Sequence, residues 1–332
     1  MEHNKYNILA IDHGNHSIKT PYDTFISGLS SYGTVPRLAD LYITYKGDYY
    51  TLNGDVPPYR KDKTLNEDLM VYTLFAAYRE AKAGRLDLTK PIHLACGLPP
   101  MHYSLMKKNM ASYFNQRDKV RLVANGEPGK ELFFKTVRVY AQGAAAIAAA
   151  SIEADMGLGM KPRYTNYPTY IIVDIGGGTT DVIYFKEGKI IPSQCASNED
   201  FSIIRMENRI IDDIAAETGI RMKIHTVEDI LLGRPSVYTS EDAPDFSKRI
   251  LAIIKRAKKD CAQDIVTMIN NVIPDAVTAP WIFEGAGTLL IQNELQSSNG
   301  KSPAMEFLCD QRLNAKGYFY ARQRELATLG KI

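Results

Sequence analysis

Apolar and polar positions alternate through residues 7–50 of this chain, which predicts short β-strands rather than helices. One apolar run ends at Asp12, the chain turns at Gly14, and another extended run leaves the turn. A second tight turn is expected at Gly47-Asp48. The strands predicted for this meander are Ile8–Ile11, Ser17–Thr20, Phe25–Gly28, Leu41–Lys46 and Tyr49–Leu52.

The pattern becomes helical near Asn66, and this helix should stop at Gly84. A short buried strand, Ile92–Gly97, is expected next. The elements predicted after it are a helix over roughly 101–116, strands near 119–124, 131–134 and 136–140, and an Ala-rich helix over roughly 142–155. Residues 156–169 are rich in Gly and Pro and are the best candidate for a link between two halves.

The strand–turn–strand pattern starts again after this link, at Ile171–Ile183, with Gly176-Gly177-Gly178 in the turn. Helices are predicted at about 202–218, 226–231 and 246–270. A strand over Pro280–Glu284 precedes a helix that opens at Gly285-Ala286-Gly287, and a terminal helix is expected near 303–325. Hairpins followed by helices, twice over, indicate an α/β fold that is duplicated without an obvious sequence repeat.

Length and composition indicate an ordinary soluble protein of about two domains, because the chain has 332 residues of which 45% are hydrophobic and 23% are charged. The net charge of +2 is too balanced to make the whole surface attract nucleic acid. The N-terminus does not resemble a signal peptide, and acidic residues follow the Ala-rich run too soon for a membrane span. The cysteines match no metal-ligand spacing and indicate a reduced, cytoplasmic chain; they are Cys96, Cys195, Cys261 and Cys309.

The first Asp-Gly hairpin has the residues of a phosphate-binding turn. An Asp followed two residues later by Gly is common in turns of no function, but Lys19 on the returning strand shares a face with Ser17. Backbone N–H groups of the turn and the Lys19 ammonium suit the β- and γ-phosphates of a nucleotide. The candidate binding residues here are Asp12, Gly14, Asn15, His16, Ser17 and Lys19.

The second hairpin carries a stronger signal. Three consecutive glycines allow a ligand to approach the backbone, and the strands on both sides favour an ordered turn over a flexible loop. Its candidate binding residues are Gly176, Gly177, Gly178, Thr179 and Thr180. If the two turns face each other, Asp12 and Asp174 can hold Mg²⁺ through its water shell. This predicts a nucleotide hydrolase or kinase built from two similar halves.

Two further motifs are weaker by themselves. Gln142 follows a strand at the start of the Ala-rich helix, where it could orient a water for attack on phosphorus or simply begin the helix. Gly285, Ala286 and Gly287 form a small-residue turn that could lie against a base or ribose, or only start a helix. Other phosphate motifs fail, because Gly126-Glu127-Pro128-Gly129-Lys130 has the wrong spacing and Leu290 replaces the third Gly of a dinucleotide fingerprint.

Together these segments resemble the actin-like ATPases. The matching motifs, in family order, are Asp12-His13-Gly14 with Lys19, Val139–Ala144, Asp174–Asp181 and Phe283–Gly287. The Tyr49–Gly54 segment and the tail Asn314–Tyr320 are most similar to the bacterial plasmid-partitioning actins of the ParM/StbA group. The adenosine motif departs from the family pattern, because Ala286 stands where Gly is common.

This resemblance implies an actin-like, ribonuclease H-like duplicated fold of two domains with a central nucleotide cleft. Domain I would span 1–160 with a small insertion at about 33–90. Domain II would span 161–332 with an insertion at about 203–275, and the helix at about 303–325 would pack back on domain I. It further implies ATP, with GTP as the alternative, and Mg²⁺. Asp12 and Asp174 would organise the metal-bound phosphates and Gln142 would position water, with Gln142 and Asp174 as the catalytic pair.

The implied activity is ATP hydrolysis coupled to polymerisation into cytoskeletal filaments that segregate plasmid DNA. The partners would be other copies of the chain and an adaptor protein bound to centromere-like DNA, with no tight direct DNA binding and no membrane. Two alternatives remain. A small-molecule kinase shares the clamp but needs a catalytic Asp for its acceptor, and a DnaK-type ATPase module normally carries a substrate-binding domain for which this sequence leaves no room.

Overall fold

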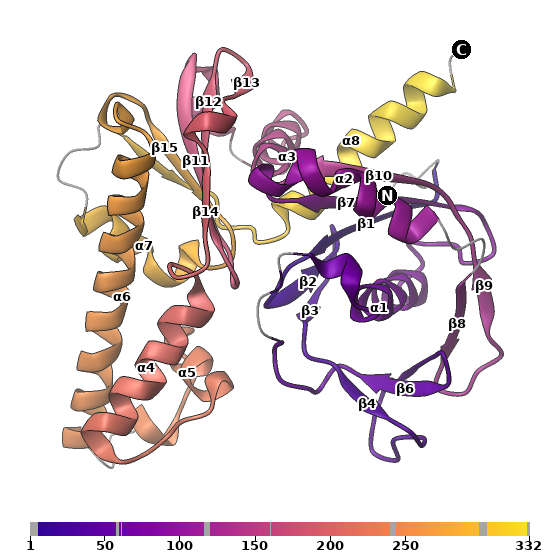
Figure 1. The fold of residues 1–332 in the computed structure, drawn as a ribbon, viewed down its shortest axis with the longest axis horizontal. Helices are drawn as coiled ribbons and strands as arrows, with labels where there is room; N and C mark the ends of the chain where they lie inside the picture. Colours follow the sequence, from indigo (N-terminus) through magenta and orange to yellow (C-terminus); the bar gives the residue numbers. More distant parts are fainter. Residues whose placement is uncertain are drawn as a thin grey trace. The chain divides into compact units, whose positions relative to one another are not determined.

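The computed structural model describes residues 6–57, 60, 62–115, 120–159, 161–239, 244–298 and 304–330 (Figure 1). The chain divides into two compact units. The first contains Met1–Pro162 together with Gln311–Ile332, and the second is the continuous segment Arg163–Asp310. Among the residues described, no helix is both long enough and apolar enough to cross a membrane.

The first unit is built on a five-stranded sheet whose order is β10-β7-β1-β2-β3. Its strands are β1 (Ile8–His13), β2 (Ser17–Lys19), β3 (Thr24–Ile26), β7 (Ile92–Leu98) and β10 (Phe134–Ala141). The three strands β10, β7 and β1 are parallel, whereas β1, β2 and β3 form an antiparallel meander. Every residue of β1 is buried, which explains its nearly continuous apolar run.

The helices among the described residues of this unit are α1 (Asp68–Lys82), α2 (Pro100–Asn115), α3 (Ala144–Asp155) and α8 (Leu313–Leu329). Helix α8 lies against α3 and β1. The helices approach so closely that a Cβ on Gly317 would overlap the backbone carbonyl of Ala145. Lys316 and Tyr320 contact Glu153 beside this crossing, at 2.7 Å and 3.2 Å. The Ala-rich run of α3 therefore permits close packing of a helix from the far end of the chain.

A second sheet of the first unit is wholly antiparallel, in the order β4-β6-β5-β8-β9. Its strands are β4 (Ser30–Tyr32), β5 (Ile43–Tyr45), β6 (Asp48–Thr51), β8 (Val120–Ala124) and β9 (Lys130–Leu132). Of these strands, β5 and β6 lie within the predicted insertion at about 33–90, whereas β4, β8 and β9 lie outside it. Nor does 33–90 have a separate core, since Leu69 and Phe75 of α1 share one cluster with Leu9 of β1.

The second unit has a sheet in the order β13-β12-β11-β15-β16, with β14 also paired to β12. Its strands are β11 (Thr169–Ile175), β12 (Thr180–Lys186), β13 (Lys189–Ile190), β14 (Ala196–Asn198), β15 (Trp281–Glu284) and β16 (Met305–Phe307). The hairpin β11–β12 is antiparallel, and β15 runs parallel to β11. As in the first unit, an antiparallel hairpin is joined to a parallel strand, which is the duplication that the sequence order predicts.

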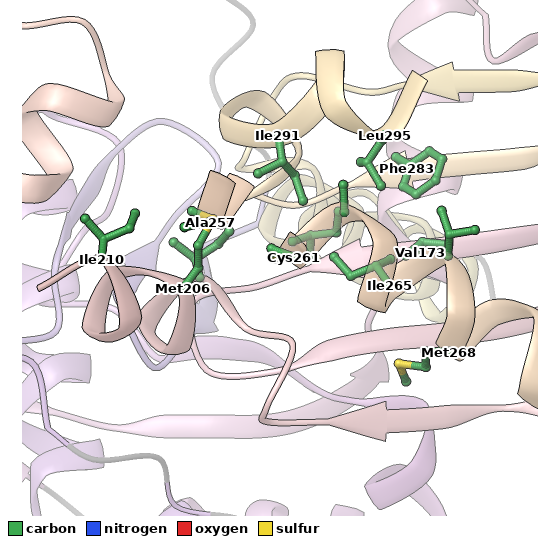
Figure 2. Packing of buried hydrophobic residues seen from close by; sticks show 14 of the residues in the cluster. Val173, Met206, Ile210, Ala257, Cys261, Ile265, Met268, Phe283, Ile291 and Leu295 are labelled. Atoms are coloured by element: carbon green, nitrogen blue, oxygen red, sulfur yellow. The ribbon is translucent and has the colours of Figure 1, made fainter. Parts of the chain in front are cut away.

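The helices of this unit are α4 (Ile203–Thr218), α5 (Ile224–Leu231), α6 (Pro244–Val272) and α7 (Thr288–Ser298). Helix α6 packs against both α4 and α7. Figure 2 shows how their apolar side chains meet those of the sheet, where Met206 and Ile210 come from α4, Cys261 and Ile265 from α6, and Ile291 and Leu295 from α7. Short 3₁₀ turns complete the two units: η1 (Lys63–Leu65), η2 (Arg163–Asn166), η3 (Pro192–Gln194), η4 (Val237–Thr239) and η5 (Ala276–Thr278).

The predicted terminal helix near 303–325 is wrong at its start. Residues Met305–Phe307 form β16, paired in parallel with β15, and the helix begins only at Leu313. Strand β4 was also not predicted. Both strands are three residues long, and such short strands are stabilised by their neighbours rather than by local sequence.

Candidate functional site

The first hairpin brings three predicted site residues together around one carboxylate. Asp12 and Lys19 are direct cross-strand partners on β1 and β2, and Lys19 Nζ lies 3.4 Å from Asp12 Oδ2. The amide Nε2 of Gln142 donates a hydrogen bond of 2.8 Å to the other oxygen, Asp12 Oδ1. Asp12 is buried, so this arrangement is held away from bulk water and is well defined.

Gln142 itself is fixed by its backbone. It follows β10, and its N–H donates to the carbonyl of Leu98 at the end of β7 (3.0 Å). The next residue, Gly143, has φ of 72°, a value that favours glycine, and its N–H donates to Asn314 Oδ1 at 2.9 Å. Asn314 is the second residue of α8, so a residue that sequence reasoning did not assign to the site anchors the peptide that follows Gln142.

The turn between β1 and β2 contains Gly14, Asn15 and His16. A Cβ on Gly14 would overlap the Ser17 carbonyl and lie 3.2 Å from Lys19 Nζ, so only glycine fits. Ser27 donates to two carbonyls of the turn, through its hydroxyl to Asn15 and through its N–H to His16 (3.0 Å). With these carbonyls tied to the strand behind, the turn has a fixed backbone, as a phosphate cradle requires.

His13 and Lys63 support the turn from within the unit. The His13 ring stacks on Phe114, and its Nε2 lies 3.0 Å from the Thr73 hydroxyl, which itself donates to the Leu69 carbonyl. Burial, together with the Lys63 charge, lowers the pKa of His13 to about 3, so the imidazole is neutral. His13 therefore supports the turn from the interior of the unit, with its ring directed at Thr73 of α1.

Lys63, on η1, donates a hydrogen bond from Nζ to the backbone carbonyl of His13. Burial lowers the pKa of Lys63 to about 8; Asp12 opposes that shift and Lys19 adds to it. The turn residues His13, Gly14 and Asn15 line a cavity of about 50 Å³ together with Lys63 and Tyr72. No sequence motif marks Lys63, which was not predicted as a site residue.

In the second hairpin, three acidic residues stand side by side across three strands. Asp174 on β11 is the cross-strand partner of Asp181 on β12 and of Glu284 on β15. All three are buried. Asp181 accepts a hydrogen bond from the Thr179 hydroxyl (3.1 Å), while burial and the neighbouring Asp174 raise the pKa of Asp181 to about 7. Asp181 ends the motif that carries the resemblance, yet it was not assigned a role from sequence.

The glycine turn of this hairpin is tied to the start of α4. Gly176 N–H donates to the Thr179 carbonyl at 2.9 Å, and the carbonyls of Gly176 and Gly177 accept from Ile203 and Ile204 at 3.3 Å and 3.0 Å. The Thr180 hydroxyl donates to the Phe201 carbonyl (2.8 Å) and therefore has a structural partner. Gly178 completes this turn, which is an ordered loop.

The predicted adenosine motif packs on the end of β11. Gly285 has φ of +90°, and a Cβ there would lie 2.5 Å from Asp174 Oδ1 and 2.6 Å from the Ile175 carbonyl. The N–H of Gly287 donates to that same carbonyl at 2.9 Å. Glycine is thus required at 285, and a Cβ on Gly287 would lie 2.5 Å from side-chain carbons of Ile175 and Ile203. The motif and Asp174 form one connected structure.

The donor set fits a magnesium nucleotide. Within the described residues there is no group of three or more His, Cys, Asp or Glu side chains arranged to hold a metal ion. Mg²⁺ in nucleotide sites is held by one or two carboxylates, with phosphate oxygens and waters completing its shell. Asp12 in the first unit and Asp174 in the second each place a carboxylate beside a turn near a strand end, the kind of ligand that such a site uses.

The comparisons with known proteins agree on the fold. A family model described as "Archaeal actin homologue MreB-like, C-terminal" matches residues 172–297. An archaeal actin homologue has a TM-score of 0.74 at 15% identity, covering 96% of this chain and 99% of its own. The same homologue in complex with ADP has a TM-score of 0.71 at 15% identity with the same coverage.

A ParM filament structure from Clostridium botulinum has a TM-score of 0.69 at 17% identity, over 96% of this chain and 99% of the filament subunit. No curated protein sequence matches. The actin-like fold predicted from the motifs is therefore confirmed, as is the predicted resemblance to ParM proteins, and the similarity to archaeal actin homologues is an additional finding. The roles of the individual site residues stay predictions.

Proposed function

We propose that this actin-like protein is a nucleotide-dependent, filament-forming ATPase that binds Mg-ATP through groups of both hairpins. The observation that carries the proposal is the 2.8 Å hydrogen bond from Gln142 Nε2 to Asp12 Oδ1. A side-chain amide has one donor end and one acceptor end. With its NH₂ group held by Asp12, Gln142 is left with its carbonyl to accept a hydrogen bond from an attacking water.

In phosphoryl transfer the protein forms no covalent bond to the substrate in this scheme, because catalysis depends on positioning the reactants and on neutralising charge. Lys19 and the N–H groups of the two turns would hold phosphate oxygens. Asp12 and Asp174 would hold Mg²⁺ through water, and the ion would supply charge neutralisation at the phosphates. Gln142 would orient the water, and Asp174 would complete the catalytic pair.

We propose ATP as the nucleotide. The base or ribose would lie near the turn Gly285-Ala286-Gly287, which packs directly beside Asp174. A structural neighbour of this chain is a complex with ADP, which supports an adenine nucleotide. GTP is the alternative, and direct competition between the two nucleotides distinguishes them.

The cellular role that we propose is segregation of plasmid DNA through an adaptor protein, in the cytoplasm. ParM proteins, including a filament form, are among the structural neighbours, which supports self-association and a partitioning role. The adaptor is invoked because a net charge of +2 gives the chain little electrostatic attraction for DNA.

The test is to follow light scattering, pelleting and phosphate release together after adding ATP, GTP or ADP with Mg²⁺. We expect filaments with ATP, slow phosphate release, and no lasting polymer with ADP. Electron microscopy of the ATP sample checks that the scattering comes from filaments. Hydrolysis without polymer would favour a DnaK-type module, and phosphoryl transfer to an added small molecule would favour a kinase.

A further inference from the structure

The Lys63 ammonium contacts the backbone of the first hairpin rather than a carboxylate. Its Nζ donates to the carbonyl of His13, fifty residues earlier in the chain. Lys63 makes no ion pair with any residue in the described ranges, and both oxygens of nearby Asp12 already have partners in Lys19 and Gln142. A partly buried lysine whose hydrogen bond goes to one peptide carbonyl requires an explanation, because desolvating its charge is costly.

That carbonyl belongs to the peptide between His13 and Gly14. In a trans peptide the C=O and the following N–H point in opposite directions, so fixing the carbonyl also fixes the N–H of Gly14. No hydrogen bond joins the Gly14 N–H to another described residue. The same glycine approaches Lys19, since a Cβ there would lie 3.2 Å from Lys19 Nζ. Gly14 is therefore flanked by two lysines, with one of them holding its peptide.

A glycine peptide in a turn rotates more easily than any other, because no Cβ restricts its φ. If this peptide rotated, its carbonyl oxygen would take the place of the Gly14 N–H in the phosphate site. The oxygen carries a partial negative charge, so it would repel phosphate instead of binding it. A cation on the carbonyl prevents the rotation and also polarises the peptide, which strengthens the N–H as a donor.

We propose that Lys63 is a positioning residue of the phosphate site, which holds the His13–Gly14 peptide so that the Gly14 N–H donates to a phosphate oxygen of the nucleotide. The inference rests on the proposed function, since it requires a bound nucleotide. Lys63 acts through the peptide and does not itself contact phosphate. It also ties the segment that contains η1 to nucleotide binding.

The experiment compares the wild-type protein with Lys63→Met, Lys63→Arg and the control Lys82→Met, which removes an exposed lysine at the end of α1. Lys63→Met should raise the KM and the Kd for ATP by about tenfold, which is about 1.4 kcal/mol, with a smaller effect on kcat. Lys63→Arg should restore most of the affinity, and Lys82→Met should match the wild type. An unfolding curve of Lys63→Met, measured without nucleotide and compared with that of the wild type, checks that the variant is folded.

The direct readout is the amide NMR resonance of Gly14. It should move downfield when ADP or ATP binds to the wild-type protein, and this movement should be lost or reduced in Lys63→Met. If the wild-type protein binds and hydrolyses ATP and Lys63→Met binds ATP just as tightly, the inference is wrong and the proposed function stands. If affinity falls but the Gly14 resonance still moves as in the wild type, Lys63 contacts phosphate directly and the positioning role is wrong.

If Lys63→Met does not fold, the wild type still decides the matter, because a Gly14 resonance that does not respond to nucleotide contradicts the proposal. A wild-type protein that binds no nucleotide by calorimetry overturns the proposed function itself. These failures are therefore distinguishable.

Discussion

Gln142 and Asp12 are joined by a 2.8 Å hydrogen bond across 130 residues of sequence, with the amide as donor and the carboxylate as acceptor. The bond sets which end of the amide remains for a ligand. Since Asp12 also pairs with Lys19 at 3.4 Å, one carboxylate orients both the predicted water-positioning group and a predicted phosphate-binding group. The proposed roles in hydrolysis and in phosphate binding are thereby linked through Asp12.

Replacing Gln142 by Ala should slow hydrolysis while sparing nucleotide binding. We expect phosphate release to fall by about tenfold or more, since losing a positioning group raises the barrier by at least ~1.4 kcal/mol. If hydrolysis times disassembly, filaments of Gln142→Ala should form with ATP and persist. Pelleting over time, with ATP consumption measured in parallel, checks both effects. Slow hydrolysis combined with wild-type disassembly would show that hydrolysis is not the timer.

Replacing Asp174 by Ala should reduce phosphate release by about tenfold or more for the same reason, because it removes a proposed ligand of the Mg²⁺ water shell. Asp260→Ala is the matched control, since Asp260 is an acidic residue of the same unit that pairs with Arg209 at 2.7 Å on the surface. Unchanged turnover in folded Asp174→Ala would contradict the assignment.

Gly285→Ala should damage the site more than the backbone strain alone explains. The added Cβ would lie 2.5 Å from Asp174 Oδ1, at a φ of +90°. Gly188→Ala is the control, because Gly188 has φ of +76° with nothing near its Cβ position. Both variants should lose about 1–2 kcal/mol of stability from the left-handed conformation. Only Gly285→Ala should also lose nucleotide affinity; equal affinities in calorimetric titrations would count against a role for this turn.

The buried carboxyl group of Glu207 should make the free energy of unfolding decrease as pH rises. The residue is fully buried on α4, and neither carboxyl oxygen has a hydrogen-bond partner among the described residues. Burial, with Glu228 nearby, raises its pKa from 4.5 to about 8. The folded protein therefore binds this proton more tightly than the unfolded chain does. Its contribution to stability is complete below pH 4.5 and is lost as pH rises to about 8.

Glu207→Gln should flatten that dependence by about 1.4 kcal/mol per pH unit within this window and should be more stable than the wild type at pH 9. Urea unfolding across pH 5 to 9 measures the difference, with the exposed residue Glu199, changed to Gln, as the control. Parallel curves for the wild type and Glu207→Gln would show that this carboxyl is solvated.

The protein alone should bind DNA weakly, with a Kd above about 1 µM at physiological salt. The basic stretch Lys248–Lys259 of α6 is partly neutralised within the chain, because Arg256 lies 3.3 Å from Asp213 and 3.2 Å from Glu217, and Lys258 lies 3.4 Å from Glu294. A gel shift or an anisotropy titration provides the measurement. Tight, sequence-specific binding without an adaptor would overturn this view.

The hairpins were predictable because their signals are local. An apolar run, an Asp and a Gly within a few residues specify a strand and a turn, as at Asp12-His13-Gly14 and Asp174–Gly178. The contacts that join such segments are not local. Lys63 bonds to a backbone carbonyl, and a carbonyl leaves no signature in sequence. Asn314 likewise supports Gly143 from a helix that is 171 residues away.

Element boundaries were less predictable wherever tertiary pairing decides them. Residues Met305–Phe307 have no strand pattern of their own and become extended because β15 lies beside them. The pairing of β5 with β8 has the same character, because about 75 residues separate the two strands along the chain. In both cases a neighbour distant in sequence overrides a weak local preference.

The crossing at Gly317 and Ala145 sets an order of events during synthesis. The segment that forms α8 leaves the ribosome only after the whole second unit has been made, since that unit ends at Asp310. The second unit is continuous and can fold at once, whereas the first has to wait with the Ala-rich side of α3 uncovered. Until α8 docks, Asn314 cannot fix Gly143 beside Gln142. Catalytic competence, and with it assembly, would then be acquired only after the second unit has been completed.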